Sequence, residues 1–221
     1  MLQIYGSPLS SPTNKVRYVA NFLGIPFEFH SINLTVGEHR QPEFLKINPL
    51  GKIPVINDAG FTLGESNAII RYLADKQQNS IYPRDLKQRA LVDQWLDEVS
   101  QHVHLSIRKI LFNTHIYKIR KITADERALQ EGRQELAREL VLVEQQLANS
   151  PNLAAEHITL ADIALLSALD ASELVKLELS IYPYLNAWRN RLMQESFYKD
   201  CHVNYTVGFQ ELLARATQAS S

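Results

Sequence analysis

The sequence contains a single cysteine, Cys201, among 221 residues. One thiol cannot form an internal disulfide, and the paired-cysteine motifs of zinc and redox sites are excluded. A chain without disulfides is typical of a reducing compartment, so we expect a cytoplasmic protein. Glycine and proline are also few, at 8 and 9 residues. Such a composition excludes a disordered or fibrous chain.

Net charge is nearly absent as well. Lys and Arg number 23 and Asp and Glu number 24, which leaves a formal net charge of −1. This balance gives no electrostatic reason to expect binding to nucleic acid or to a membrane surface. No segment approaches the roughly 20 consecutive apolar residues that span a bilayer, and the first residues lack the apolar run of a signal peptide. The length and the 45% hydrophobic content instead suit a globular protein with one large domain or two modest ones.

Strand and helix patterns alternate over the first 80 residues. Short apolar or alternating runs predict strands at 2–5, 27–32, 54–56 and 61–63, and helical spacing predicts helices at 12–23, 41–47 and 66–76. Beyond a linker at 79–85 only helical patterns follow, with a long helix over 123–148 and a central, apolar helix over 160–169. We therefore expect an α/β domain over residues 1–78 and an all-helical domain over 86–221, with fraying over 216–221.

The loop after the first predicted strand leads into a helix and contains Ser10 and Ser11. The unpaired N–H groups and the positive end of the helix dipole point into such a loop. A hydroxyl in this place can donate a hydrogen bond to a thiolate and help to hold a bound thiol ionised near neutral pH. Tyr5 is a weaker candidate for the same role. The plainer alternative is that Ser10 or Ser11 only caps the helix.

Two further turns carry groups that suit a peptide-like ligand. A cis Ile53-Pro54 bond would turn the backbone of Ile53 outward, where an extended peptide can bind as an added strand, whereas base rates favour a trans proline. Glu65 and Ser66 open the predicted helix 66–76. Ser66 is either a simple N-cap or, with its N–H group, a partner for a carboxylate. Because Glu65 can accept from an ammonium group, the pair suits an amino-acid head group.

Other motifs favour a structural role. Thr159 and Asp162 form a capping box with Asp in place of Glu, which predicts a helix start and no catalysis. His102 and His104 point to different faces of a helix, and the seven histidines show no zinc-binding spacing, so we expect no metal. A local excess of basic residues predicts a solvated helix face or, alternatively, the wall of a cleft or dimer seam. It comprises Arg108, Lys109, Lys118, Arg120 and Lys121.

In combination, these motifs resemble the cytosolic glutathione transferase family over almost the whole chain. The matching segments are 5–10 with Val16-Arg17, then 37–39, 48–55, 65–69 and 159–162. The N-terminal pattern is similar to the serine-type branches, such as the phi and theta classes and their bacterial relatives. The resemblance implies a thioredoxin-like N-terminal domain, an all-α C-terminal domain and a homodimer.

The resemblance also implies roles for single residues. Ser10 would stabilise the glutathione thiolate, with the neighbouring Ser11 as the fallback. Ile53, before a proline that is cis in this family, would pair its backbone with the cysteinyl part of glutathione, so Pro54 belongs to the site.

The two ends of glutathione are assigned in the same way. Glu65 and Ser66 would hold the γ-glutamyl end, and His39 and Lys52 match positions that contact the glycine end or the backbone. Without the resemblance, His39 reads as a surface histidine. Thr13 stands where some serine-type relatives carry cysteine, which argues against a cysteine-centred thiol-transferase activity.

The implied activity is that of a glutathione transferase with glutathione as co-substrate and no metal. Its thiolate would attack a small hydrophobic electrophile held against the helical domain, in a pocket lined by residues from about 102–118 and the C-terminal segment. Two alternatives stay open. The same site could support glutathione-dependent peroxide reduction, dehalogenation or isomerisation, or the chain could be a non-catalytic binding or regulatory protein. The intact set of site residues speaks against the non-catalytic alternative.

Overall fold

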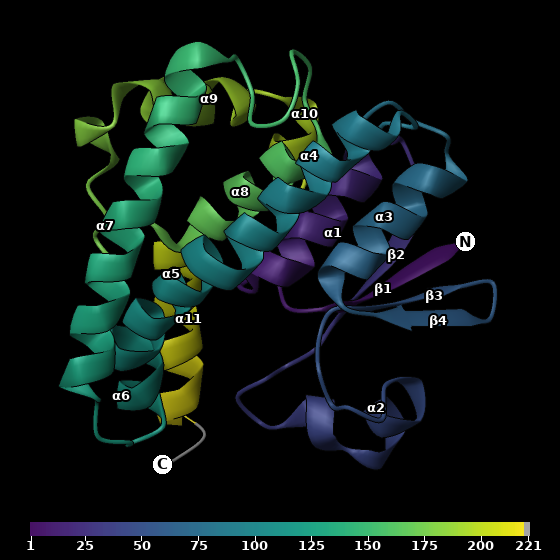
Figure 1. Cartoon of the computed structure of the whole chain (residues 1–221). Coiled ribbons are helices and arrows are strands. Elements are labelled where there is room, and N and C mark those ends of the chain that lie inside the picture. Colours follow the sequence, from purple (N-terminus) through teal and green to yellow (C-terminus); the bar gives the residue numbers. More distant parts are fainter. Residues whose placement is uncertain (219–221) are drawn as a thin grey trace.

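Four strands form one mixed sheet in the N-terminal part of the chain, in a computed structural model that describes residues 1–218 (Figure 1). They are β1 (Leu2–Gly6), β2 (Phe27–Ser31), β3 (Val55–Asp58) and β4 (Phe61–Gly64). Their order in the sheet is β2-β1-β3-β4. β1 runs parallel to β2 and antiparallel to β3, and β4 is antiparallel to β3. The expected strands are therefore present, with shifts of one or two residues at their ends.

Both faces of this sheet are covered by helices, because successive side chains of each strand point to opposite faces. Ile4 and Ile56 are fully buried in the main core, on the face of α1 and α3. On the other face, Ile32, Phe44 and Val55 form a second small core beneath α2. The helices of this part are α1 (Ser11–Phe22), η1 (Glu38–Arg40, a 3-10 turn), α2 (Pro42–Ile47) and α3 (Ser66–Lys76).

The remainder of the described chain is helical. A continuous helical rod comes first, in which two π-helical turns separate the α-helical parts. It consists of α4 (Leu86–Glu98), η2 (Val99–Val103), α5 (His104–Leu111), η3 (Phe112–Ile116) and α6 (Tyr117–Ile119). The later helices are α7 (Glu126–Asn149), α8 (Leu160–Ala168), α9 (Pro183–Leu192), α10 (Ser196–Lys199) and α11 (Tyr205–Gln218), with 3-10 turns η4 (Leu169–Ala171) and η5 (Leu179–Ile181).

α8 is the central helix of this part, as its apolar sequence predicts, and each of its nine residues is buried. It packs against α1, which joins the helical part to the sheet. Asp162 accepts hydrogen bonds at its start from the N–H and the hydroxyl of Thr159, both at 2.8 Å. The same carboxylate also accepts from the N–H of Leu153 at 2.9 Å and from the indole of Trp188 at 3.2 Å. Asp162 therefore organises more of the domain than the capping box alone predicts.

Two boundaries in the helical part differ from expectation. α7 starts at Glu126 and not near 123, because Asp125 caps it by accepting from the N–H of Ala128 at 3.0 Å. Residues 216–218, which we expect to fray, belong to α11, and 219–221 lie outside the described residues. The domain limits 1–78 and 86–221 stay a prediction. Within the described part of the chain, no helix combines the length and apolar composition needed to cross a lipid bilayer.

Candidate functional site

The predicted site residues gather at one edge of the sheet. The strand register pairs Tyr5 with Val55 and Val55 with Gly64, so the end of β1, the start of β3 and the end of β4 lie together. Ser10 follows β1, Pro54 directly precedes β3, and Ser66 begins α3 after β4. α1 and α3 both start at this edge, and their unpaired N–H groups create a positive potential there. The edge is therefore suited to bind a ligand with negative groups.

The two candidate serines have different surroundings. Ser10 is the N-cap of α1 with an extended backbone (φ −116°, ψ 110°), and its side chain makes no capping hydrogen bond. Within the described residues its hydroxyl has no partner, and the side chain is only half-buried. Ser11 is 8% exposed, and its Oγ lies 3.4 Å from the hydroxyl of Tyr205 on α11. Ser10 is thus open to a ligand, whereas Ser11 faces the interior.

A buried polar network continues behind Ser11. Asn14 on α1 donates to the hydroxyl of Tyr205 at 3.4 Å and to the carboxylate of Asp170 at 3.1 Å. Tyr18 donates to the same Asp170 oxygen at 2.9 Å. Burial raises the pKa of Asp170 to about 7, although the hydrogen bonds from Asn14 and Tyr18 oppose the shift. This network fixes the first turns of α1, and with them the loop that carries Ser10.

The segment before β3 is shaped by backbone features. The Ile53–Pro54 peptide bond is cis, as the family resemblance implies and against the base rate. Asn48 donates to the carbonyl of Lys52 at 2.7 Å, which holds the preceding turn. Gly51 has φ +59°, a left-handed conformation that suits glycine. The side chain of Lys52 is exposed and has no partner among the described residues.

Glu65 and Ser66 lie at the start of α3. Glu65 is its N-cap and has φ +62°, an unusual backbone conformation for a residue other than glycine. Beneath them is Lys15 of α1, which is 6% exposed and donates to the side-chain oxygen of Asn67. Burial lowers the pKa of Lys15 to about 7, with Arg71 adding to the shift and Glu65 opposing it. A buried amine therefore supports the residues predicted to hold the γ-glutamyl end.

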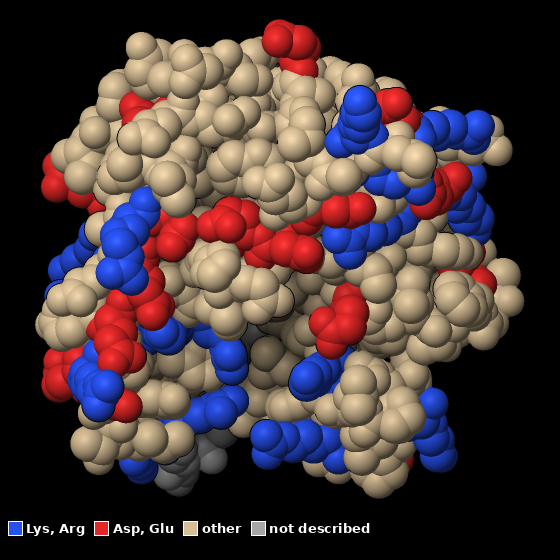
Figure 2. All heavy atoms as spheres, in the orientation of Figure 1, with Lys and Arg blue, Asp and Glu red and all other residues tan. Residues whose placement is uncertain are grey.

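His39 lies in η1, on the wall of this region, and it is half-buried. Its Nδ1 atom is buried without a hydrogen-bond partner in the described structure. Burial lowers the pKa of His39, and Arg40 and Arg120 act in the same direction. Because Arg120 follows α6, the helical part places a positive charge near His39 from the other side. Figure 2 shows the surface hollowed between the two parts of the molecule, with Lys and Arg side chains on both sides.

Several candidates are engaged elsewhere. The hydroxyl of Tyr5 donates to Gln3 at 3.1 Å, and its ring stacks on His30 with centroids 4.5 Å apart. Of the basic group expected on a solvated face, Lys109 pairs with Glu135 at 2.7 Å, and Arg120 is near enough to His39 to help lower the pKa of that histidine. Whether this group forms the wall of a cleft stays a prediction.

The helical part covers the serine loop. A Cβ atom on Gly208 of α11 would lie 2.5 Å from Leu9, so α11 and the loop are in close contact. His104 of α5 is near Lys15, and burial and this lysine lower its pKa to about 4. A cavity of about 520 Å³ lies farther away, between α5, α7 and residues 174–182, and contains none of the predicted glutathione residues.

Sequence reasoning missed Lys15, Asn67 and Tyr205 as neighbours of the site. Lys15 carries a weak signal, because it interrupts the apolar face of a helix that must be buried. Tyr205 carries none, since it meets Ser11 only when α11 docks on α1 across 194 residues of chain.

Comparison with known proteins extends over both parts. Residues 4–80 match the family model for the glutathione S-transferase N-terminal domain, and residues 107–195 match the one for the C-terminal domain. Glutathione S-transferase 3 of Zea mays is 33% identical over 193 residues, which cover 85% of this chain and 86% of the maize protein. A glutathione S-transferase of Arabidopsis thaliana is 29% identical over 217 residues, or 94% of this chain and 99% of that protein.

Solved structures agree with these matches. A human theta-class glutathione transferase, in complex with the glutathione conjugate of 1-menaphthyl sulfate, superposes with a TM-score of 0.87 at 30% identity. The match covers 99% of this chain and 91% of the human one. A delta-class enzyme of Nilaparvata lugens gives a TM-score of 0.84 at 30% identity over 98% of this chain and 100% of that one. The chain therefore belongs to the glutathione S-transferase family and is a glutathione transferase enzyme.

Proposed function

We propose that this enzyme binds glutathione at the sheet edge and that Ser10 activates its thiol. The observation that carries the proposal is the hydroxyl of Ser10, which has no partner among the described residues and lies at the N-terminus of α1. A hydroxyl that donates to a thiolate, together with the positive end of a helix, lowers the pKa of the thiol. Ser11 acts as a structural residue, because its side chain is buried against Tyr205.

The rest of glutathione follows the order of the turns along this edge. The backbone of Ile53, before the cis Pro54, pairs with the cysteinyl part of the tripeptide. The N-terminus of α3 at Ser66 binds the γ-glutamyl carboxylate, and Glu65 accepts from its ammonium group. The exposed side chain of Lys52 and the half-buried imidazole of His39 hold the glycine carboxylate.

The electrophile is a small hydrophobic molecule held against the helical part. The α5–α6 segment of the rod and α11 line its pocket. α11 lies next to the serine loop, because Gly208 of α11 packs against Leu9 and Tyr205 of α11 meets Ser11. The Ser10-stabilised thiolate attacks an electrophilic carbon. The carbon–sulfur bond forms as a leaving group departs with its electron pair, or as a polarised double bond takes up a proton.

Steady-state kinetics with an activated aromatic halide test this assignment. Ser10→Ala removes a hydrogen bond to a charged sulfur, which contributes about 1.5–3 kcal/mol, so kcat/KM falls by roughly 10- to 100-fold. Ser11→Ala is the matched control and leaves kcat/KM within about threefold of the wild type, a difference under 1 kcal/mol. The reverse ranking of the two variants contradicts the assignment.

We also propose that the enzyme is a homodimer. Phe61 on the edge strand β4 is 49% exposed, and its ring lies 5.2 Å from that of Tyr72 on α3. An exposed phenylalanine on an edge strand, backed by a half-buried tyrosine, suits burial against a second copy. Light scattering of the purified protein is expected to give twice the chain mass, and Phe61→Glu to reduce it to the monomer mass.

For its location we propose the cytoplasm. The one cysteine, Cys201, is buried, and burial raises the pKa of its thiol to about 11. A fold that depends on no disulfide suits a reducing compartment. Fractionation of source cells checks this, with the protein expected in the cytoplasmic fraction together with most of the glutathione-conjugating activity.

A further inference from the structure

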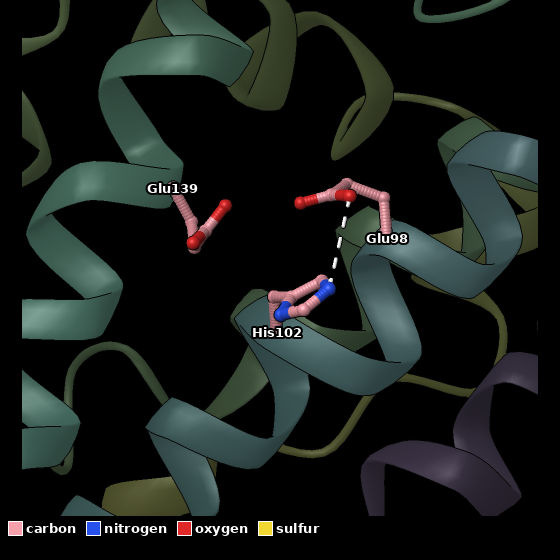
Figure 3. Close-up of side chains that lie close together, drawn as sticks. All are labelled: Glu98, His102 and Glu139. Atoms are coloured by element: carbon pink, nitrogen blue, oxygen red, sulfur yellow. Dashed lines mark ion pairs between the residues drawn. The ribbon is translucent and has the colours of Figure 1, made fainter.

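Three metal-ligating side chains meet outside the proposed glutathione site. Glu98 is the last residue of α4, His102 lies in the π-helical turn η2, and Glu139 lies on α7. One ligand atom from each lies within 4.8 Å of the other two, and Nε2 of His102 is 3.9 Å from Oε2 of Glu98. Figure 3 shows the three side chains turned toward a common point between the two helices. None of them has a role in the proposed reaction.

The backbone holds these residues in fixed positions. Glu98 and His102 are four residues apart on a continuous rod, a spacing that places two side chains on one face. Their neighbours Val99 and Val103 are 2% and 0% exposed, and Leu140, next to Glu139, is 0% exposed. α7 packs against η2 through this core. The three ligands are therefore presented by well-packed helices, although the side chains themselves are half-buried or exposed and able to adjust.

The surroundings of Glu139 differ from those of three other glutamates along α7. Glu131 pairs with Arg127 at 2.8 Å, and Glu135 pairs with Lys109 at 2.7 Å. Glu144 accepts from two N–H groups at the start of α9. Glu139 has no lysine or arginine within ion-pair distance in the described part of the chain and instead lies beside the carboxyl group of Glu98.

Two carboxylates that face each other repel, and a divalent cation between them would remove this repulsion. The side chains of Glu98 and Glu139 face the same point as the imidazole of His102, with one ligand atom of each within 4.8 Å of the other two. Figure 2 shows that acidic side chains gather across α4 and α7 on this face, which attracts cations. Lys109 of α5 is already paired with Glu135, one turn before Glu139 on α7.

The donor set indicates the kind of cation. Imidazole nitrogen and carboxylate oxygen are ligands of Zn²⁺ and of similar divalent metals, at about 2.0–2.2 Å. Ca²⁺ and Mg²⁺ prefer oxygen ligands alone. Tetrahedral ligands at these distances are roughly 3.3–3.5 Å apart, so the side chains need to close by about 1 Å from their present separation. Three protein ligands leave a fourth position for water.

We propose that Glu98, His102 and Glu139 bind a divalent cation of the Zn²⁺ type, which links the α4–η2 rod to α7. The site lies within the helical part and shares no residue with the glutathione site, so it acts on stability and not on the thiol. From the sequence we expect no metal, because the histidines do not have the spacing of a zinc site. The relevant pattern is instead Glu98 with His102 on one helical rod, together with Glu139, which lies 37 positions after His102.

Calorimetric titration of the chelator-treated full chain with Zn²⁺ tests the proposal, with Co²⁺ absorbance as a second readout. We expect one equivalent to bind, with a rise in Tm and visible Co²⁺ bands. His102→Gln and Glu139→Gln each weaken binding at least tenfold and abolish the rise. Mg²⁺ neither raises Tm nor displaces Co²⁺.

Two matched variants control for general surface binding. Glu131→Gln changes an exposed glutamate on the same helix, and His157→Gln changes a histidine in another part of the chain; both retain wild-type binding. The proposal is overturned if Zn²⁺ does not bind in a one-to-one ratio, or if His102→Gln and Glu139→Gln bind as tightly as the wild type. Circular dichroism of the metal-free variants verifies that they fold. We expect both to fold, because Glu139→Gln only removes a repulsion between two carboxylates and His102 is an exposed side chain.

Discussion

The hydroxyl groups of Ser11 and Tyr205 lie 3.4 Å apart in the interior of the molecule, although 194 residues separate them in the chain. This contact ties the first turn of α1 to α11. It also separates the roles of two adjacent serines, because Ser11 is turned inward while Ser10 keeps an open hydroxyl at the helix start.

Tyr205→Phe tests the structural half of that relationship. The change leaves Asn14 and Ser11 without their buried partner, and we expect a loss of about 1–2 kcal/mol in the free energy of unfolding. Urea denaturation measures it. Tyr184→Phe, at a residue that is 53% exposed, is the control and leaves stability unchanged. Equal stability of the two variants would show that the buried contact contributes nothing.

Lys15→Met tests the buried amine beneath the γ-glutamyl residues. The pKa of Lys15 is about 7 in the folded protein against 10.5 for an ordinary lysine, so the unfolded chain binds more protons between these values. Stability of the wild type therefore rises with pH through that window, by up to about 1.4 kcal/mol per pH unit. Methionine removes this contribution. Denaturation at pH 7 and pH 9 should show that the free energy of unfolding rises more with pH in the wild type than in the variant. An equal difference between the two proteins at both pH values would contradict the lowered pKa of Lys15.

Asp162→Ala tests the carboxylate at the start of α8. Besides the Thr159 hydroxyl, the N–H groups of Leu153 and Thr159 and the indole N–H of Trp188 lose their buried acceptor. Each unsatisfied donor costs about 1–3 kcal/mol, so we expect a destabilisation of at least about 3 kcal/mol. Asp125→Ala removes an exposed N-cap with one partner on α7 and costs about 1 kcal/mol. Thermal unfolding of both variants gives the comparison, and similar losses would be inconsistent with this role of Asp162.

Gly6→Ala tests the close packing between β1 and α1. A Cβ atom there would lie 2.4 Å from Cγ2 of Thr13, whose side chain is fully buried. We expect overpacking to cost about 1–3 kcal/mol. The double variant with Thr13→Ala should recover part of the loss, because the two methyl groups then no longer collide. Additive losses in the double-mutant cycle would show that the clash is absent.

Local patterns in the sequence predict much of this fold. The helix 66–76 has the same limits in the structure, because its polar start and apolar spacing are local signals. The sheet edge is also predictable, since the turns that carry Ser10, Pro54 and Ser66 each adjoin a strand end. The cis state of Pro54 follows from the family resemblance and not from local sequence, which favours trans.

Contacts between distant segments account for what the sequence does not predict. Lys15 meets Asn67 only when α1 and α3 pack side by side on the sheet, and Ser11 meets Tyr205 only after α11 has docked on α1. The same holds for Glu139, which joins Glu98 and His102 from another helix. Pairings of this kind depend on tertiary packing, and no periodicity in one segment encodes them.

The most direct test of the central claim is the pKa of the glutathione thiol bound to the enzyme, followed by the ultraviolet absorbance of the thiolate against pH. We expect the wild type to lower this pKa well below that of free glutathione, Ser10→Ala to raise it by about 1–2 units, and Ser11→Ala to leave it near the wild-type value. A bound thiol whose pKa is unchanged by Ser10→Ala, or raised by Ser11→Ala alone, would contradict the assignment of Ser10.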